Sequence, residues 1–441
     1  MRILHTSDWH IGRTFHGHST LANLRSVLAA LAVEVRERSV DVVVVAGDIF
    51  DSATPAAEAY TVLESAVVAL REAGASVVLT SGNHDSATRL GFMSRFSGLA
   101  GVHVVTRQEQ HDQPITLADE HGPVHVYGIP YLEPSLLRHH YPDAALRTHE
   151  QVLTFVMDRI RADLARRGGR SVVLSHCFAV NVAATDADAT NNDASGHGAS
   201  DVGASKHRAS QHGASDVGAS QHGAGDVERD ITSGGLDYVP LSVFDGPDYV
   251  ALGHIHGRAA LSDRARYSGA PLHYSFSEAA KPRGAWLVDL DASGLASVGW
   301  VELPVPRPLA VVTGVLDEIL SDPALGGVEA SWLSVVLTDN VRPLDGMRRL
   351  QARFPHCVTL EHRPAVTAAA AGDSYAERVK GQSDLDIVAG FLSHVRNGVG
   401  PTDIEKAIVA EVLAEVERAE HDEPAADDRA TAEPEWVPVN A

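Results

Sequence analysis

Five short motifs place carboxylate, imidazole and amide side chains at intervals along the first 256 residues of the chain. They are Asp8-Trp9-His10, Gly47-Asp48, Gly82-Asn83-His84-Asp85, Ser175-His176 and Gly253-His254-Ile255-His256. This mixture of donors suits Mn²⁺, Fe²⁺ or Zn²⁺ and differs from the all-oxygen ligand sets of Ca²⁺. Two such ions about 4 Å apart, bridged by a carboxylate, can activate water for attack on a phosphate ester. The motifs therefore predict a two-metal hydrolytic site.

Asp48 is the natural bridging ligand, because it follows the strand nearest in sequence to both halves of the site. We assign one ion to Asp8, His10, Asp48 and His256, and the other to Asp48, Asn83, His176 and His254. His84 lies beside a ligand without being needed as one. We therefore predict that His84 stabilises the transition state or protonates the leaving oxygen.

Each motif follows an apolar run rich in β-branched residues. The runs are residues 2–5, 42–45, 77–79, 172–174 and 249–252. Runs of this kind are typical of strands buried on both faces, and polar residues at their carboxyl ends converge on one edge of a sheet. Helical spacing of apolar residues is found over 21–35, 60–70 and 150–167. Alternating strands and helices predict an α/β fold.

The strings around these residues resemble those of the SbcD family of nucleases, within the calcineurin-like metallophosphoesterase superfamily. The matching strings are Ser7–Gly12, Gly47–Asp51, Gly82–Ser86, Glu228–Ile231, Gly234–Leu236, Gly253–His256, Tyr267–Pro271 and Ser275–Glu278. The resemblance implies an αββα sandwich with a smaller α+β capping domain and C-terminal helices. The chain departs from archaeal and eukaryotic relatives at Asp51, where they carry histidine, so no phosphate-contacting role is transferred to that residue.

The activity implied by the resemblance is double-strand exonuclease and single-strand or hairpin endonuclease cleavage of DNA. Two Mn²⁺ ions per protomer are implied, with Fe²⁺, Mg²⁺ or Zn²⁺ as alternatives. The implied partners are DNA ends and hairpins and an SbcC-type coiled-coil ATPase, with a homodimer inside a heterotetramer that serves DNA repair, recombination and replication.

Two other classes of protein are weighed against this one. A phosphoprotein or cyclic-nucleotide phosphoesterase would share the metal motifs. Phosphoprotein phosphatases carry an arginine in a GDxVDRG string, whereas Gly47-Asp48 continues here as Ile49-Phe50-Asp51-Ser52. Small cyclic-nucleotide enzymes usually lack a long C-terminal extension. A non-catalytic scaffold of the same fold would have lost metal ligands, and here the set is complete.

The sequence divides into four segments. Residues 1–275 form the predicted nuclease domain, and 276–380 the capping domain, with a hairpin near Ser293-Gly294 and a strand–helix–strand–helix–strand pattern over 309–367. Residues 381–419 form a helical segment, and 420–441 an acidic tail expected to be disordered. Within the first domain, residues 183–227 are rich in Ala, Ser, Gly, Asp and His, and the string Gly198–Ser205 recurs from Gly213.

The repeat over 183–227 is expected to be disordered, because it has almost no large apolar side chain to offset its ordering entropy. A metal-binding repeat or a short β-solenoid is the alternative. The helical segment is the predicted dock for the ATPase. Its predicted contacts are Ile387, Phe391, Leu392, Ile404 and Ile408, and Thr402–Glu405 is read as a capping box. Packing of these helices against the capping domain is the alternative.

The net charge of −22 runs against the basic surface that is usual for nucleic-acid binders. Part of that charge lies in the predicted tail, and bound divalent ions add positive charge where a phosphodiester must sit. We predict phosphate contacts from Arg13, His16 and Arg89, with solvated surface as the alternative for each.

Two cysteines, Cys177 and Cys357, imply no disulfide framework. There is no basic-then-apolar leader at the N-terminus and no apolar run near the roughly 20 residues of a membrane span. A cytoplasmic location and no membrane association are therefore expected.

Overall fold

The computed structural model describes residues 1–181, 238–364, 381–396 and 398–422. The predicted insertion at 183–227, the strings over 228–236 and all of the predicted tail after Asp422 lie outside the described residues. The chain divides into two compact units. Unit 1 comprises Met1–Ala310 and Ala330–Trp332, and unit 2 comprises Val311–Glu329 and Leu333–Ala441.

One sheet of unit 1 has the strand order β16-β15-β1-β4-β5-β6. Its strands are β1 (Arg2–Thr6), β4 (Val42–Ala46), β5 (Ser76–Thr80), β6 (Val102–Val105), β15 (Gly284–Asp291) and β16 (Gly294–Glu302). The first four are parallel. The apolar run of β4 is buried on both faces. Val43 and Val45 pack in one core with helices α1 (Leu21–Glu37) and α2 (Ala57–Glu72), while Val42 and Val44 pack in another.

The other six-stranded sheet has the order β13-β14-β12-β9-β8-β7. Its strands are β7 (Ile115–Asp119), β8 (Gly122–Ile129), β9 (Arg170–His176), β12 (Tyr249–Gly253), β13 (Ala259–Ala260) and β14 (Ala265–Tyr267). One face packs with helices α5 (Pro134–His140) and α6 (His149–Arg167). The other face shares a core with the first sheet, through residues such as Val172 and Leu174.

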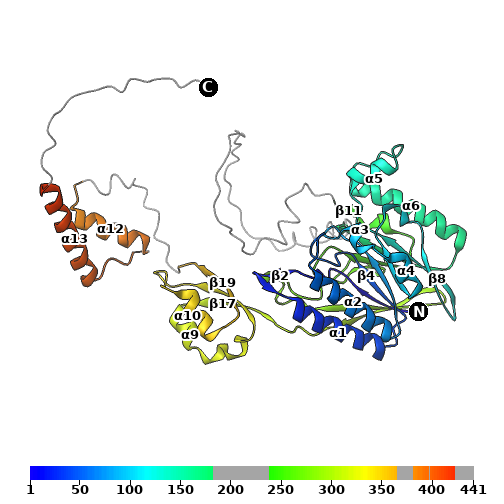
Figure 1. Ribbon diagram of the computed structural model, residues 1–441, viewed down its shortest axis with the longest axis horizontal. Helices are drawn as coiled ribbons and strands as arrows, with labels where there is room; N and C mark the ends of the chain where they lie inside the picture. The colour runs from blue at the N-terminus through cyan, green and yellow to red at the C-terminus, as the bar shows by residue number, and fades with distance from the viewer. Residues whose placement is uncertain (182–237, 365–380, 397, 423–441) are drawn as a thin grey trace, which may run out of the picture. The chain divides into compact units, whose positions relative to one another are not determined.

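The layers therefore run helix, sheet, sheet, helix, and the predicted αββα sandwich is confirmed. Figure 1 shows α1 and α2 along one side of the sandwich and α5 and α6 along the other. The remaining elements of unit 1 are short. They are β2 (Thr14–Phe15), β3 (His18–Ser19), α3 (Ala87–Leu90), α4 (Ser94–Leu99), η1 (Gln108–Gln110), β10 (Ala179–Val180), β11 (Val239–Pro240), η2 (Leu241–Phe244) and η3 (Phe276–Glu278).

The predicted domain boundary at residue 275 is wrong. The prediction places hairpin β15–β16 in the capping domain, yet β15 pairs antiparallel with β1, with Ile3 opposite Val288 and His5 opposite Trp286. The hairpin thus extends the first sheet, and unit 1 continues to Ala310. The hairpin itself and its turn, where Asp291 pairs with Gly294, match the prediction.

Unit 2 begins with the predicted alternation of strands and helices. The elements are β17 (Leu309–Gly314), α9 (Leu316–Ser321), η4 (Pro323–Val328), β18 (Trp332–Leu337), α10 (Gly346–Arg353) and β19 (Cys357–His362). The strands form a three-stranded sheet in chain order.

Two further helices complete unit 2, α12 (Asp384–Val395) and α13 (Asp403–Asp422). The predicted capping box is present, since the Glu405 amide donates to Thr402 Oγ1 and Glu405 Oε2 accepts from the Thr402 amide. Helix α13 continues past the predicted tail start at residue 420. Within the described residues, no helix is both long and apolar enough to cross a membrane.

Candidate metal centre

The five motifs meet at the edge where strands from both large sheets end. Asp8 and His10 follow β1, Asp48 follows β4, and Asn83 and His84 follow β5, all in the first sheet. His176 ends β9 and the His254–His256 segment follows β12, both in the second sheet. Because the shared core separates the sheets along most of their length, this edge is where their polar residues can meet.

Side chains assigned to the first ion lie close together. Ligand atoms of Asp8, His10 and His256 are within 4.8 Å of one another. The Nε2 atoms of His10 and His256 are 3.0 Å apart, and His10 Nε2 is 3.5 Å from Asp48 Oδ2. Asp8 also contacts the segment that follows β12, because its Oδ1 accepts a 2.9 Å hydrogen bond from the His254 amide.

A second group surrounds His176. Its Nε2 lies 3.3 Å from Asp48 Oδ2 and 3.0 Å from Asn83 Oδ1. Its Nδ1 donates to Ala46 O at 3.0 Å, which leaves Nε2 available as a ligand atom. The His254 ring centroid is 5.2 Å from that of His176. Asp48 thus lies within reach of both groups, as a bridging carboxylate must.

Glycines permit the close approach of the two sheets. A Cβ added at Gly253 would lie 1.8 Å from Ala46 O, and one at Gly47 would lie 2.2 Å from His176 Nδ1. Several ligands themselves have left-handed backbone conformations, with φ of 52° at Asp8, 44° at His10 and 48° at Asp48. Strained backbone of this kind is typical of functional sites, where the surrounding fold holds it in place.

Burial and mutual charge set the ionisation of the ligands. Burial disfavours the charged form of Asp48, yet the neighbouring His176 and His10 hold the pKa of that carboxyl well below its usual range. Burial lowers the pKa of His254 to about 4, with His176 adding to the effect, and burial with His10 lowers that of His256. Both histidines are therefore neutral near pH 7, the form that binds metal.

Burial also opposes protonation of His176, but the charge of Asp48 outweighs it and raises the His176 pKa to about 9. An ion bound at Nε2 would therefore have to displace a proton, so metal binding at this position should weaken as the pH falls.

These residues fit a pair of divalent ions. Two ring nitrogens 3.0 Å apart, at His10 and His256, can hold only one hydrogen between them, whereas a cation satisfies both lone pairs. Imidazole, carboxylate and amide donors on both sides of Asp48 match the preferences of first-row metals.

His84 lies among the ligands but is anchored differently from them. Its Nδ1 donates to Asp51 O at 2.9 Å, which leaves Nε2 available, and its backbone amide donates to Asp48 Oδ1 at 3.0 Å. Its ligand atom falls within 4.8 Å of those of His10 and Asp48. This position suits either a ligand or a group that contacts substrate, and the catalytic role of His84 stays a prediction.

The predicted phosphate contacts differ in their distance from the ligands. Arg13 lies in the site, 3.6 Å from Asp51 Oδ1 and with its guanidinium 4.8 Å from the Tyr274 ring centre. His16 lies between β2 and β3 with its ring against Phe276. The exposed Arg89 donates to Ala53 O at 2.9 Å, beside the segment that follows Asp48.

Asp85 is a site residue to which the sequence analysis gave no role. Its carboxylate accepts hydrogen bonds of 2.9–3.0 Å from the amides of Ile49, Phe50 and Gly82. It thereby ties the loop after β4, which carries Asp48, to the loop after β5, which carries Asn83. Burial, followed by the charge of Asp48, raises the pKa of Asp85 to about 6. The signal in the sequence that could have indicated a role for Asp85 is its position within the Gly82–Ser86 motif.

Two family models match the chain. One, described as calcineurin-like phosphoesterase, matches residues 1–258. The other, named for SbcD and described as type 5 capsule protein repressor C-terminal domain, matches residues 305–396. A solved crystal structure is similar over 69% of this chain and 99% of its own, at 13% identity and a TM-score of 0.30. That likeness is too low to carry an argument.

We predict that Asp85→Asn lowers both stability and Mn²⁺ affinity. The amide cannot accept all three backbone hydrogen bonds, and an unsatisfied buried donor costs about 1–3 kcal/mol. The matched control is Asp248→Asn. Asp248 accepts a hydrogen bond from the Ser171 amide, but it lies where β9 and β12 begin, at the ends of these strands away from the candidate ligands. Melting temperature should fall in both variants, and Mn²⁺ affinity by titration only in Asp85→Asn. Wild-type affinity in Asp85→Asn would contradict the positioning role.

Proposed function

This chain belongs to the calcineurin-like phosphoesterase family, and from that premise we propose that it is a two-metal DNA nuclease. We propose exonuclease cleavage of double strands and endonuclease cleavage of single strands and hairpins, in cytoplasmic DNA repair and recombination. The observation that carries the proposal is Asp48 within reach of both histidine groups. The C-terminal match named for SbcD directs the choice of substrate to DNA.

In the proposed mechanism each residue has a distinct task. Asp8, His10, Asp48 and His256 would hold one ion, and Asp48, Asn83, His176 and His254 the other. The two ions, proposed to be Mn²⁺, would neutralise the phosphodiester and lower the pKa of the attacking water. The hydrogen bond from His84 Nδ1 to Asp51 O leaves Nε2 available, and we propose that it stabilises charge or delivers a proton to the leaving oxygen.

We further propose that α12 and α13 bind an SbcC-type coiled-coil ATPase. The helices are joined by a bidentate pair, in which Arg396 donates to Glu405 at 2.8 and 3.0 Å. Their apolar residues remain exposed in the described structure. Phe391, Ile404, Ile408, Val412 and Val416 are all between 48% and 75% exposed, while Ile387 and Leu392 are half-buried. An apolar stripe at helical spacing suits packing against the helices of another protein.

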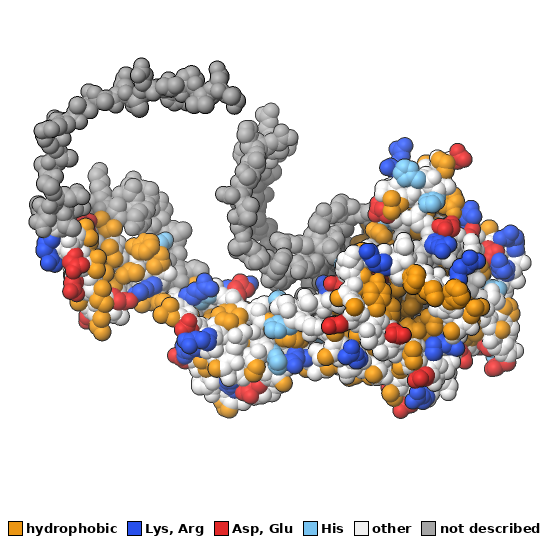
Figure 2. All heavy atoms as spheres, viewed as in Figure 1, with side chains coloured by type: hydrophobic (Ala, Val, Ile, Leu, Met, Phe, Trp, Pro, Cys, Tyr) orange, Lys and Arg blue, Asp and Glu red, His pale blue; other side chains and the backbone are white. Residues whose placement is uncertain are grey.

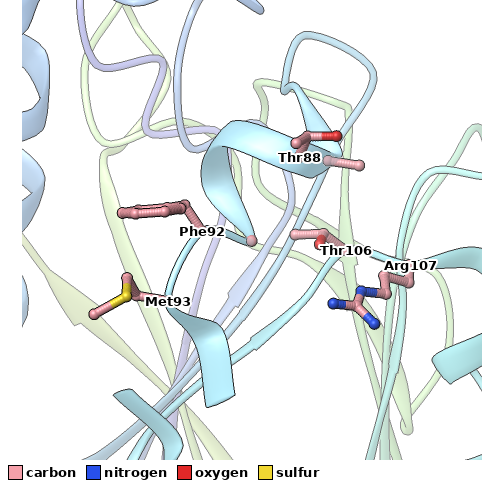
Figure 3. Close-up of a pocket in the computed structure, with 7 residues that line it drawn as sticks. Thr88, Phe92, Met93, Thr106 and Arg107 are labelled. Atoms are coloured by element: carbon pink, nitrogen blue, oxygen red, sulfur yellow. The ribbon is translucent and has the colours of Figure 1, made fainter. Parts of the chain in front are cut away.

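We also propose that the chain forms a homodimer through a second apolar surface, the α3–α4 surface. It consists of Phe92, Met93, Phe96 and Leu99, all more than half exposed. Figure 2 shows apolar side chains gathered over this part of unit 1. In Figure 3, Phe92 and Met93 project to the same side at a hollow of about 390 Å³ that Thr106 and Arg107 also line. Apolar patches of this kind mark association surfaces.

Two substitutions test the assignment of roles within the site. His84→Ala should lower Mn²⁺-dependent cleavage of end-labelled duplex and hairpin DNA by about 10²- to 10⁴-fold, as expected for loss of one acid or charge stabiliser. It should retain both metals, whereas Asp48→Ala should lose metal because it removes a ligand from each ion. Metal content per protomer separates the two. A metal-free His84→Ala protein would show that His84 is a ligand, and wild-type protein inactive on all DNA would refute the nuclease proposal.

Phe391→Glu should abolish co-purification with the ATPase partner while Mn²⁺-dependent cleavage of short DNA is retained, because the charge would enter an apolar interface. A chain ending at Gly381 should behave in the same way. The control is Val33→Glu on α1, since Val33 is 49% and Phe391 50% exposed. If the Phe391→Glu protein and the chain ending at Gly381 both co-purify with as much ATPase as the wild type does, the docking site lies elsewhere.

Leu99→Glu should convert a dimer to a monomer, measured by light scattering coupled to size-exclusion chromatography. Leu344→Glu is its control, because both leucines are 88% exposed and Leu344 lies in unit 2. If Leu99→Glu remains dimeric, the α3–α4 surface is not the interface. If the wild-type chain is monomeric at micromolar concentration, the homodimer proposal fails.

A further inference from the structure

A buried ion pair adjoins the first metal group and takes no direct part in ligation. Glu278 and Arg283 are each only 1% exposed. Arg283 Nη2 pairs with Glu278 Oε2, and the same oxygen accepts from the Tyr274 amide at 3.0 Å. Burying two charges costs more than their attraction commonly returns, so a buried pair is weak evidence for a stabilising role. Its position suggests a different role.

Both members of the pair act on His256. Arg283 Nη1 donates to the His256 carbonyl. Glu278 Oε1 lies 3.8 Å from His256 Nδ1, and neither of these two atoms makes a hydrogen bond to any described residue. A carboxylate on this side favours a proton on Nδ1, which leaves the Nε2 lone pair facing His10.

His10 has a corresponding carboxylate. Asp51 Oδ1 lies 3.2 Å from His10 Nδ1, which, like His256 Nδ1, makes no hydrogen bond of good geometry to a described residue. The second metal group is built differently, because His176 Nδ1 donates to the backbone oxygen of Ala46. A carboxylate behind an imidazole makes it a more basic and better oriented ligand than a carbonyl does.

Resting on the two-metal site proposed above, we propose that Glu278 and Asp51 are positioning residues for one of the two ions. Each would favour a proton on Nδ1 of its imidazole and leave the Nε2 lone pair available to hold an ion. The second ion depends on neither carboxylate. The two metal affinities are therefore separable by substitution outside the ligand set.

The test is a Mn²⁺ titration of the full-length chain, followed by the electron paramagnetic resonance signal of free Mn²⁺. Wild type should bind two ions. Glu278→Gln and Asp51→Asn should each weaken one binding step by about 10- to 100-fold and leave the other unchanged, which is the usual effect of losing such a partner. The double variant Glu278→Gln/Arg283→Met should weaken the same binding step without leaving an unpaired buried cation. It replaces the Glu278→Gln variant if the latter fails to fold.

The matched control is Asp163→Asn. Asp163 is also buried and ion-paired, to Arg166 and Arg167, but lies on α6, which supplies no ligand. It should lower melting temperature and leave both affinities unchanged. Wild-type titration curves for the Glu278 and Asp51 variants would overturn the inference, as would equal weakening of both steps. Fewer than two ions in the wild-type chain would overturn the two-metal proposal itself, and the inference with it.

Discussion

The architecture of unit 1 depends on bringing one buried carboxylate, Asp48, within reach of imidazoles from two different sheets. His10 approaches from the first sheet and His176 from the second, at 3.5 and 3.3 Å. A carboxylate that is 2% exposed can remain ionised only where positive charge compensates its lost hydration. His176, whose pKa is raised to about 9, supplies that charge in the free protein, and divalent ions would supply it in the loaded one.

Glycines and hydrogen-bonded carboxylates around Asp48 permit this close approach. Because Gly253 and Gly47 lack side chains, the strand ends close to a separation that any Cβ would prevent. Asp85 then ties the two loops of the first sheet together through three amides, and Asp8 ties the first sheet to the His254 loop. The strained backbone at Asp8, His10 and Asp48 is held by these contacts, so the fold itself orients these side chains.

The sequence predicted the layers and the clustering of the candidate ligands because both follow local rules. The β-branched run 42–45 favours a buried strand, and a polar residue directly after such a strand falls at the sheet edge. The boundary at 275 failed for the opposite reason, since the pairing of β15 with β1 joins residues nearly three hundred positions apart. Nothing in the local pattern of Trp286–Val288 distinguishes an added strand of the first sheet from a strand of another domain. Asp85 likewise contacts the amides of Ile49 and Phe50, more than thirty positions away in the sequence, and motif spacing does not reveal such contacts.

The C-terminal helices α12 and α13 differ from unit 1 in how little apolar surface they bury. Helix α12 contains no fully buried residue. The apolar side chains of α13 from Ile404 to Val416 remain largely exposed. Helix pairs of this size gain little from hydrogen bonds alone, because their stability comes from burying an apolar face. The Arg396–Glu405 pair is surface-accessible and contributes little by itself. A partner that covers the stripe would therefore supply most of the apolar burial that these helices lack, so docking and helix stability should be coupled. Unit 1 differs, because its described residues form three clusters of buried apolar side chains within the sandwich.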